Sequence, residues 1–115
     1  MLSRLAMEFA AEIAEHDWSD APWRLDRAGH NRMTDTNRDE RVLSPQETDC
    51  VRTNVMWVTA QVLKHLDPNL DLHEYAVACG IPRSITHRKD GSPSGGIPAG
   101  IRMTGGVAHA PGLPT

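Results

Sequence analysis

The sequence predicts an all-α fold, namely a small helical domain of three to four helices followed by a Gly/Pro-rich, flexible C-terminal tail. Apolar residues recur at helical spacing near the N-terminus, and a complete capping box opens the longest apolar segment. The last 26 residues contain seven glycines and four prolines. A chain of 115 residues has room for one domain with a modest core. We therefore expect one helical domain over residues 1–89 and a flexible tail over residues 90–115.

The first predicted element is an amphipathic helix over residues 2–16. Its large apolar side chains recur at spacings of three and four residues: Leu2, Leu5, Phe9 and Ile13. Its glutamates lie away from the centre of this apolar face: Glu8, Glu12 and Glu15. Such a face fits either the core of the protein or a groove on a partner protein.

Two tryptophans, Trp18 and Trp23, follow in a segment interrupted by turn-forming residues. Asp20 is positioned to cap a short turn that ends at Gly29. Tryptophan side chains fill cores, and they anchor interfaces where they are exposed. Together with two residues of the first helix, they form the predicted protein-interface set: Trp18, Trp23, Phe9 and Ile13. Residues 30–43 are polar and rich in turn formers, which predicts a loop.

The central helix has the clearest signals in the chain. Ser44 is the predicted N-cap, Pro45 takes the first helical position, and Glu47 completes the capping box. The helix is apolar over more than half of its circumference and ends at Asp67-Pro68. We expect it to supply most of the core, through Val51, Val55, Trp57, Val58, Val62 and Leu63.

A shorter helix is predicted from Asp71, its N-cap, to Cys79, and Gly80 is its expected left-handed stop. Leu70 and Tyr75 occupy the two positions of a hydrophobic staple around the cap.

Residues 72–89 resemble a helix-turn-helix. Ala76, Gly80 and Ile81 stand where that motif has a small residue, a glycine and an aliphatic residue. Thr86 departs from the motif, because it takes the position of an inward-facing aliphatic residue. The resemblance implies that residues 81–89 form a recognition segment, with DNA-contact candidates Arg83, Ser84, His87, Arg88 and Lys89.

The charge balance is not typical of a protein that coats nucleic acid, since the net charge is −3 with 12 basic and 15 acidic residues. Only Lys64 and Lys89 are lysines among the basic residues, as expected of a GC-rich genome such as that of a high-GC bacterium or its phage. Cys50 and Cys79 fall in predicted helices and indicate no disulfide scaffold. Without a signal peptide or an apolar span, we expect a cytoplasmic protein with no membrane partner.

No set of residues predicts catalysis or metal binding. Asp35, Asn37 and Asp39 alternate like the first ligands of a calcium loop, but Glu40 and Gln46 stand where that loop needs glycine and glutamate. None of the six histidines pairs with another at the spacing of a helical zinc site. The chain also has no recognisable nucleophile motif or phosphate-binding loop. We therefore expect no catalytic residues, no metal and no cofactor.

These observations favour a small, non-enzymatic interaction or regulatory module, of the accessory type made by phages and high-GC bacteria, that binds a partner protein. The alternative is a helix-turn-helix DNA-binding protein that uses residues 81–89. A homodimer is compatible with either function, because a small domain gains stability from a second copy.

Overall fold

The structure of the protein, a computed structural model, describes residues 1–113 and is mostly helical. The elements in chain order are α1 (Arg4–Glu15), a 3-10 turn (Ala21–Trp23), α2 (Pro45–Leu66), α3 (Leu72–Ala78), α4 (Arg83–Thr86), α5 (Gly96–Ala99), β1 (Met103–Thr104) and β2 (Val107–Ala108). The helical prediction is confirmed. The sequence predicted an all-α fold, but the antiparallel pair β1–β2 shows that the fold is not purely α-helical.

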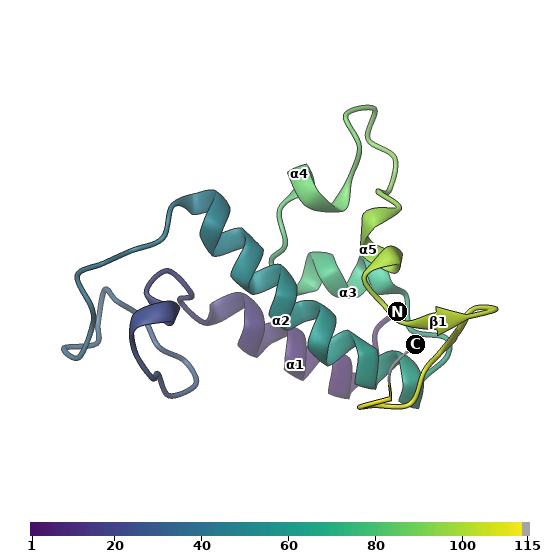
Figure 1. Ribbon diagram of the computed structural model, residues 1–115, viewed down its shortest axis with the longest axis horizontal. Helices are drawn as coiled ribbons and strands as arrows, with labels where there is room; N and C mark the ends of the chain where they lie inside the picture. Colours follow the sequence, from purple (N-terminus) through teal and green to yellow (C-terminus); the bar gives the residue numbers. More distant parts are fainter. Residues whose placement is uncertain (114–115) are drawn as a thin grey trace.

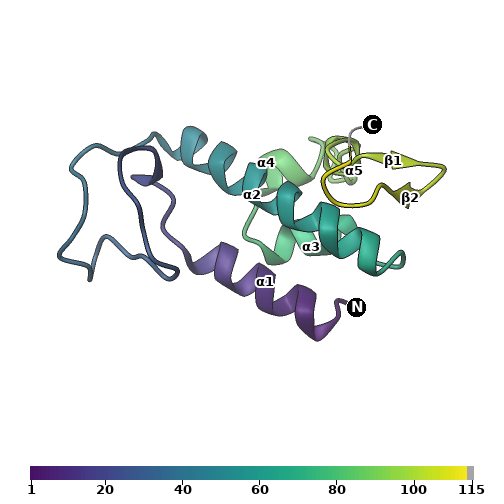
Figure 2. The ribbon, with the colours of Figure 1, turned by 60° about the horizontal axis from the view of Figure 1, so that its bottom comes forward.

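The helices α1 and α2 run antiparallel, and a long connection joins them at one end of the molecule (Figure 1). α3 packs against both, and the main core lies where these three helices meet (Figure 2). The C-terminal elements α5 and β2 pack on α3 and α2 respectively. No helix within residues 1–113 combines the length and the apolar character needed to cross a membrane.

In α1 the buried face is made mostly of small side chains. Ala6, Ala10 and Ile13 are buried, whereas Leu5 is 48% exposed and Phe9 is 43% exposed. Small residues let α2 and α3 approach the α1 backbone closely, so the larger side chains are left on the flank of the helix. The N-cap is Ser3, whose hydroxyl accepts a hydrogen bond from the backbone N–H of Ala6.

The start of α2 confirms the sequence prediction, because Ser44 and Glu47 form both hydrogen bonds of the capping box. The predicted core face of α2 is wrong in part. The face that is buried carries Thr53, Met56, Ala60, Gln61 and Leu63. Val58 and Val62 remain 70% and 40% exposed. Each follows a buried residue by two positions, about 200° around the helix axis, so both valines point away from the core.

The end of α2 and the start of α3 follow the local sequence signals closely. Leu70 and Tyr75 are both buried, and the Asp71 carboxylate accepts a hydrogen bond from the N–H of Glu74. Gly80 has a φ of 84°, the left-handed conformation that ends α3. Thr59 and Tyr75 join α2 to α3 through their hydroxyl groups, which lie 2.7 Å apart.

The segment predicted to be a flexible tail is anchored on the helices by three buried residues. Ile97, Ile101 and Ala108 are buried in the same core as the helices. The Trp57 indole donates a hydrogen bond to the carbonyl of Ile97 at 3.0 Å. The structure differs from the prediction because spaced aliphatic residues and backbone polar groups find partners on α2 that composition does not reveal. Residues 114–115 of the predicted tail lie outside the described residues.

The buried side chain of Gln61 makes the polar half of this contact. Its amide nitrogen donates to the carbonyls of Arg102 and His109, at 3.2 and 3.1 Å. Its amide oxygen accepts from the N–H of Arg102 at 2.9 Å. One side chain of α2 therefore satisfies three backbone groups on both sides of the β1–β2 hairpin.

We predict that Met56→Ala lowers the free energy of unfolding by about 2–5 kcal/mol, because Met56 is completely buried. Val58→Ala on the same helix is the matched control and should change this free energy by no more than about 0.5 kcal/mol. Urea denaturation of both variants measures the difference. Equal losses would contradict the observed orientation of α2.

We also predict that Gly100→Ala is destabilising by about 1–3 kcal/mol, because a Cβ at this position would overlap the Trp57 indole ring. Gly95→Ala is the control, since its Cβ would meet nothing closer than 3.7 Å. Thermal unfolding distinguishes the two variants. A Gly100→Ala protein as stable as the wild type would show that the C-terminal segment does not pack on Trp57.

Candidate functional site

The connection between α1 and α2, residues 17–43, is held in place mainly by polar contacts, and we call it the charged loop. It contains five aspartates and five arginines. Its two halves are joined by backbone hydrogen bonds, from Asp17 N–H to the His30 carbonyl at 2.9 Å and from Leu43 N–H to the Ser19 carbonyl at 2.7 Å. Figure 1 shows this loop extending beyond the ends of α1 and α2.

His30 lies at the centre of the charged loop and is only 2% exposed. Its Nδ1 is 2.7 Å from Asp35 Oδ2, and its Nε2 is 3.0 Å from Asp20 Oδ1. Ionised carboxylates accept hydrogen bonds and cannot donate them, so both ring nitrogens must carry a proton to make both contacts. The geometry fits an imidazolium held between two carboxylates, and we call this arrangement the His30 clasp.

The fully buried Asp20 carboxylate extends the clasp to the second half of the charged loop. It accepts a hydrogen bond from the backbone N–H of Asp39 at 3.2 Å and lies 3.4 Å from Nε of Arg32. The sequence predicted Asp20 as a cap for a short turn. A 3-10 turn does follow it, but the side chain makes no capping hydrogen bond and pairs with His30 instead.

Burial opposes the charged form of His30, but the hydrogen bond with Asp35 and the negative charges of Asp20 and Asp26 outweigh it. They raise the pKa of His30 above its ordinary value of 6.5. The backbone N–H of Asn31 and the His30 ring lower the pKa of Asp35. Both directions favour the ion pair.

Asp20, Asp26 and His30 are side chains of the metal-ligating kind, and their donor atoms lie within 4.8 Å of one another. Each already has partners in the protein. Asp26 pairs with Arg24, Asp20 lies beside Arg32, and both nitrogens of His30 contact carboxylates. A metal ion would have to displace these cations, so the donor set fits a proton on His30 better than a metal.

An open, largely apolar groove lies between α1 and the first half of the charged loop. One part, a hollow of about 370 Å³, is lined by residues that include Ile13, Trp18, Ala21 and Leu25. A second hollow of about 340 Å³ is lined by Leu5, Glu8, Phe9, Glu12 and Ala28. Glu12 and Ala28 line both hollows, which therefore adjoin. We call the combined surface the α1–loop groove.

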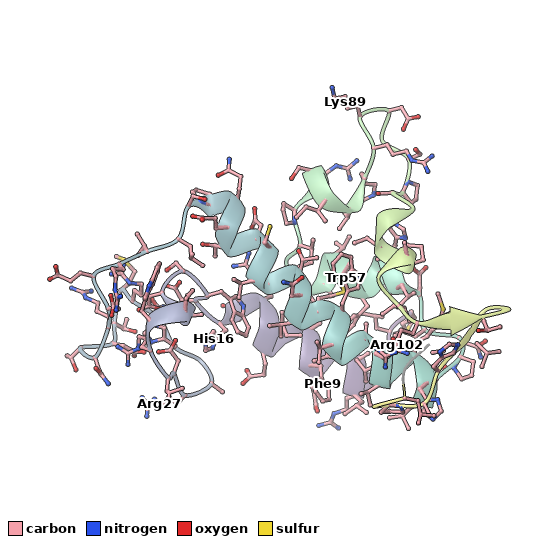
Figure 3. The ribbon with its side chains drawn as sticks, in the orientation of Figure 1. Phe9, His16, Arg27, Trp57, Lys89 and Arg102 are labelled. Carbon is pink, nitrogen blue, oxygen red and sulfur yellow. The ribbon has the colours of Figure 1, made fainter. Side chains whose placement is uncertain are left out.

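Three of the four predicted interface residues line this groove, namely Phe9, Ile13 and Trp18. Ile13 is buried and forms part of the floor, whereas Phe9 is half-exposed on the flank of α1 (Figure 3). The Trp18 indole N–H donates to the Ile13 carbonyl at 2.9 Å, which fixes the ring at the end of α1. The fourth residue, Trp23, is not part of the groove lining and lies under the guanidinium of Arg41, 5.2 Å from the ring centroid.

The rim of the groove is acidic. Glu8, Glu12 and Glu15 are exposed along α1, and Glu8 forms an ion pair with Arg4. Glu12 and Glu15 have no ion-pair partner among residues 1–113. Arg24, which also lines the groove, is neutralised by Asp26. Glu12 lines both hollows, whereas Glu15 lines neither. The groove therefore combines exposed apolar side chains with one lining carboxylate, Glu12, that has no ion-pair partner in the described chain.

The predicted DNA-contact residues lie on a separate projection. α4 is a single turn of four residues, and the chain after it returns through a bridge between His87 and Pro93. The side chains of Arg83, Ser84, Arg88 and Lys89 are exposed, and Figure 3 shows Lys89 at the tip of the projection. His87 is half-buried, and burial together with Arg83 and His73 lowers its pKa.

The cysteines do not form a site. Cys50 and Cys79 are both free thiols, the first exposed and the second buried. Burial raises the pKa of the Cys79 thiol to about 11, so this group is a thiol and not a thiolate near neutral pH.

Comparisons with known proteins give no match of any kind: no protein-family model, no curated protein and no solved structure matches the chain. The candidate site is therefore defined by its geometry alone.

Proposed function

We propose that the protein is a non-enzymatic binding module that holds a segment of a partner protein in the α1–loop groove. The observation that supports this function is the groove itself, in which large apolar side chains stay exposed beside Glu12, a carboxylate without an ion-pair partner among residues 1–113. Leu5 and Phe9 are about half exposed and Leu25 is 98% exposed. Apolar surface of this kind, rimmed by polar groups, marks interaction sites on small proteins.

The acidic rim indicates the chemistry of the partner. A segment with lysine or arginine on one side would neutralise Glu12, while its apolar side would cover Phe9 and Leu25. The α1 part of the groove, from Leu5 to Ile13, spans about 12 Å at 1.5 Å per residue. An amphipathic helix of a few turns, laid along α1, fits these dimensions and uses a common mode of peptide recognition.

We predict that Phe9→Ala weakens the binding of a basic amphipathic helix about tenfold or more, because truncating an aromatic anchor removes a large share of interface energy. The probe is a fluorescein-labelled peptide of leucine and arginine at helical spacing, about five turns long, followed by anisotropy. Val58→Ala, an equally apolar change on the exposed side of α2, is the matched control and should leave binding unchanged.

The charge part of the proposal has its own test. Glu12→Gln should weaken binding of the same peptide and reduce its dependence on salt concentration, because one unpaired carboxylate is removed from the rim. A peptide with glutamate in place of arginine should not bind. Equal binding of the acidic and basic peptides, or equal binding by the Phe9→Ala and Val58→Ala proteins, would contradict the proposed function.

DNA binding is the second candidate function, supported by the exposed basic side chains on the projection after α3. Arg83, Arg88 and Lys89 stand away from the acidic face of α1 and could contact phosphates. Fluorescence anisotropy with a labelled, mixed-sequence duplex tests this, at low salt and near-physiological salt. Binding that falls steeply with salt, and is lost in the Arg83→Ala/Arg88→Ala protein, would favour DNA binding. Absence of binding at low salt would remove it.

A further inference from the structure

We propose that the His30 clasp is a pH-sensitive latch that holds the loop wall of the α1–loop groove in place and releases it when His30 loses its proton. The opening of the loop follows from the clasp alone. Its effect on binding rests on the function proposed above.

The position of the clasp in the chain connects it to the groove. The contact between Asp20 and His30 closes the segment 20–30, and this segment supplies the side chains that form the loop wall, Ala21, Leu25 and Ala28. Leu25 and Ala28 are exposed and Ala21 is half-buried, so the wall has little apolar packing of its own. The ends of the wall are fixed by the Asp20–His30 ion pair and by the hydrogen bond from the Asp17 N–H to the His30 carbonyl, and not by a hydrophobic core.

The charges around His30 balance only when the ring is protonated. The groups that face it are Asp20, Asp26 and Asp35 from the charged loop, with Arg32 beside Asp20 and Arg24 on Asp26. From α1, the ring of His16 approaches with its centroid 6.0 Å away. Asp17 and Arg27 also act on this cluster through their charges, Asp17 on His30 and Arg27 on Asp35. Four carboxylates thus meet three guanidinium groups and one imidazolium. Loss of the His30 proton leaves one buried negative charge uncompensated.

Deprotonation also removes a donor that the structure needs. A neutral imidazole has one N–H, so it can keep Asp20 or Asp35 as a partner but not both. If His30 no longer holds the Asp20 carboxylate, that carboxylate is no longer oriented toward its other two partners, the Asp39 N–H and Arg32. The change at one ring nitrogen is therefore transmitted to both halves of the charged loop.

The direction of the pH effect follows from the raised pKa of His30. A group whose pKa is higher in the folded protein stabilises it fully below the ordinary value of 6.5, and this stabilisation is lost as the pH rises through the raised value. The latch is closed in mildly acidic solution and opens on the alkaline side of pH 6.5.

The experiment is an NMR titration of the full chain from about pH 5.5 to pH 9, a range that covers the histidine transition. Both nitrogens of His30 should be protonated at the acidic end, and its pKa should lie above 6.5. As His30 titrates, the hydrogen-exchange protection factors of the Asp17 and Asp39 amides should fall about tenfold or more, while those of α2 core amides such as Ala60 stay constant.

Two variants separate the latch from a general loss of structure. Asp35→Asn removes one charge with little change in size and should lower the His30 pKa toward its ordinary value. His30→Gln cannot titrate, so its loop protection should not vary across this pH range, whatever its absolute stability. His65→Gln, at an exposed histidine of α2, should behave like the wild type.

The arginine–leucine peptide links the latch to the groove, because its arginine side chains do not titrate in this range. Its affinity for the wild type should fall about tenfold or more through the His30 transition, but not for His30→Gln. A His30 pKa at or below 6.5, or loop protection that ignores the titration, would overturn the latch. A latch that opens as expected, in a protein that binds the peptide at no pH, would instead overturn the proposed function.

Discussion

The arrangement of the chain depends on the fact that α2 is buried along two sides at once. Its side with Met56 and Ala60 meets α1 and α3 in the main core, and its side with Trp57 and Gln61 holds the C-terminal segment. A helix with two covered sides leaves a third one free, where Val58 and Val62 are exposed. Because α2 is fixed in this way, α1 is fixed beside it, and the charged loop has to span the ends of both helices.

The loop meets this constraint with charge, since residues 17–43 offer few apolar side chains to a core. Burying His30 and Asp20 carries a large desolvation penalty, and only a nearly complete set of partners offsets it. Asp35 is the second partner of His30, and Arg32 and the Asp39 N–H are the further partners of Asp20. The conformation of the loop therefore depends on pH, because removal of the His30 proton leaves one of these buried groups without a partner. In the helical core, burial raises the pKa of Tyr75 and of Cys79, so both groups stay neutral through the pH range in which His30 titrates.

The parts of the fold that could be predicted from the sequence are those decided by neighbouring residues. Three such features are the capping box at Ser44, the staple around Asp71 and the left-handed Gly80. Each involves residues only a few positions apart in the chain. The face of α2 that is buried depends on small residues of other helices, so the prediction that Val58 and Val62 belong to the core was wrong. The packing of Ile97 and Ile101 depends on Gln61 and Trp57, some forty positions earlier in the chain. The Gly/Pro-rich composition of the C-terminal segment gives no indication of this packing.

The candidate site divides in the same way. Phe9 and Trp18 could be selected as interface candidates from the sequence, because large aromatic side chains on or next to an amphipathic helix are visible in the local pattern. The His30 clasp pairs residues five and ten positions apart within a loop, and no periodicity indicates which aspartate meets the ring. The sequence feature that points to the clasp is the high content of opposite charges in residues 17–43. This segment has five aspartates and five arginines, where a hydrophobic core would need apolar residues. A loop of that composition must be either solvated or paired internally, and a histidine that is 2% exposed indicates pairing. The groove thus has one wall set by helix packing and one set by ionisation, so its two walls respond differently to a change of pH.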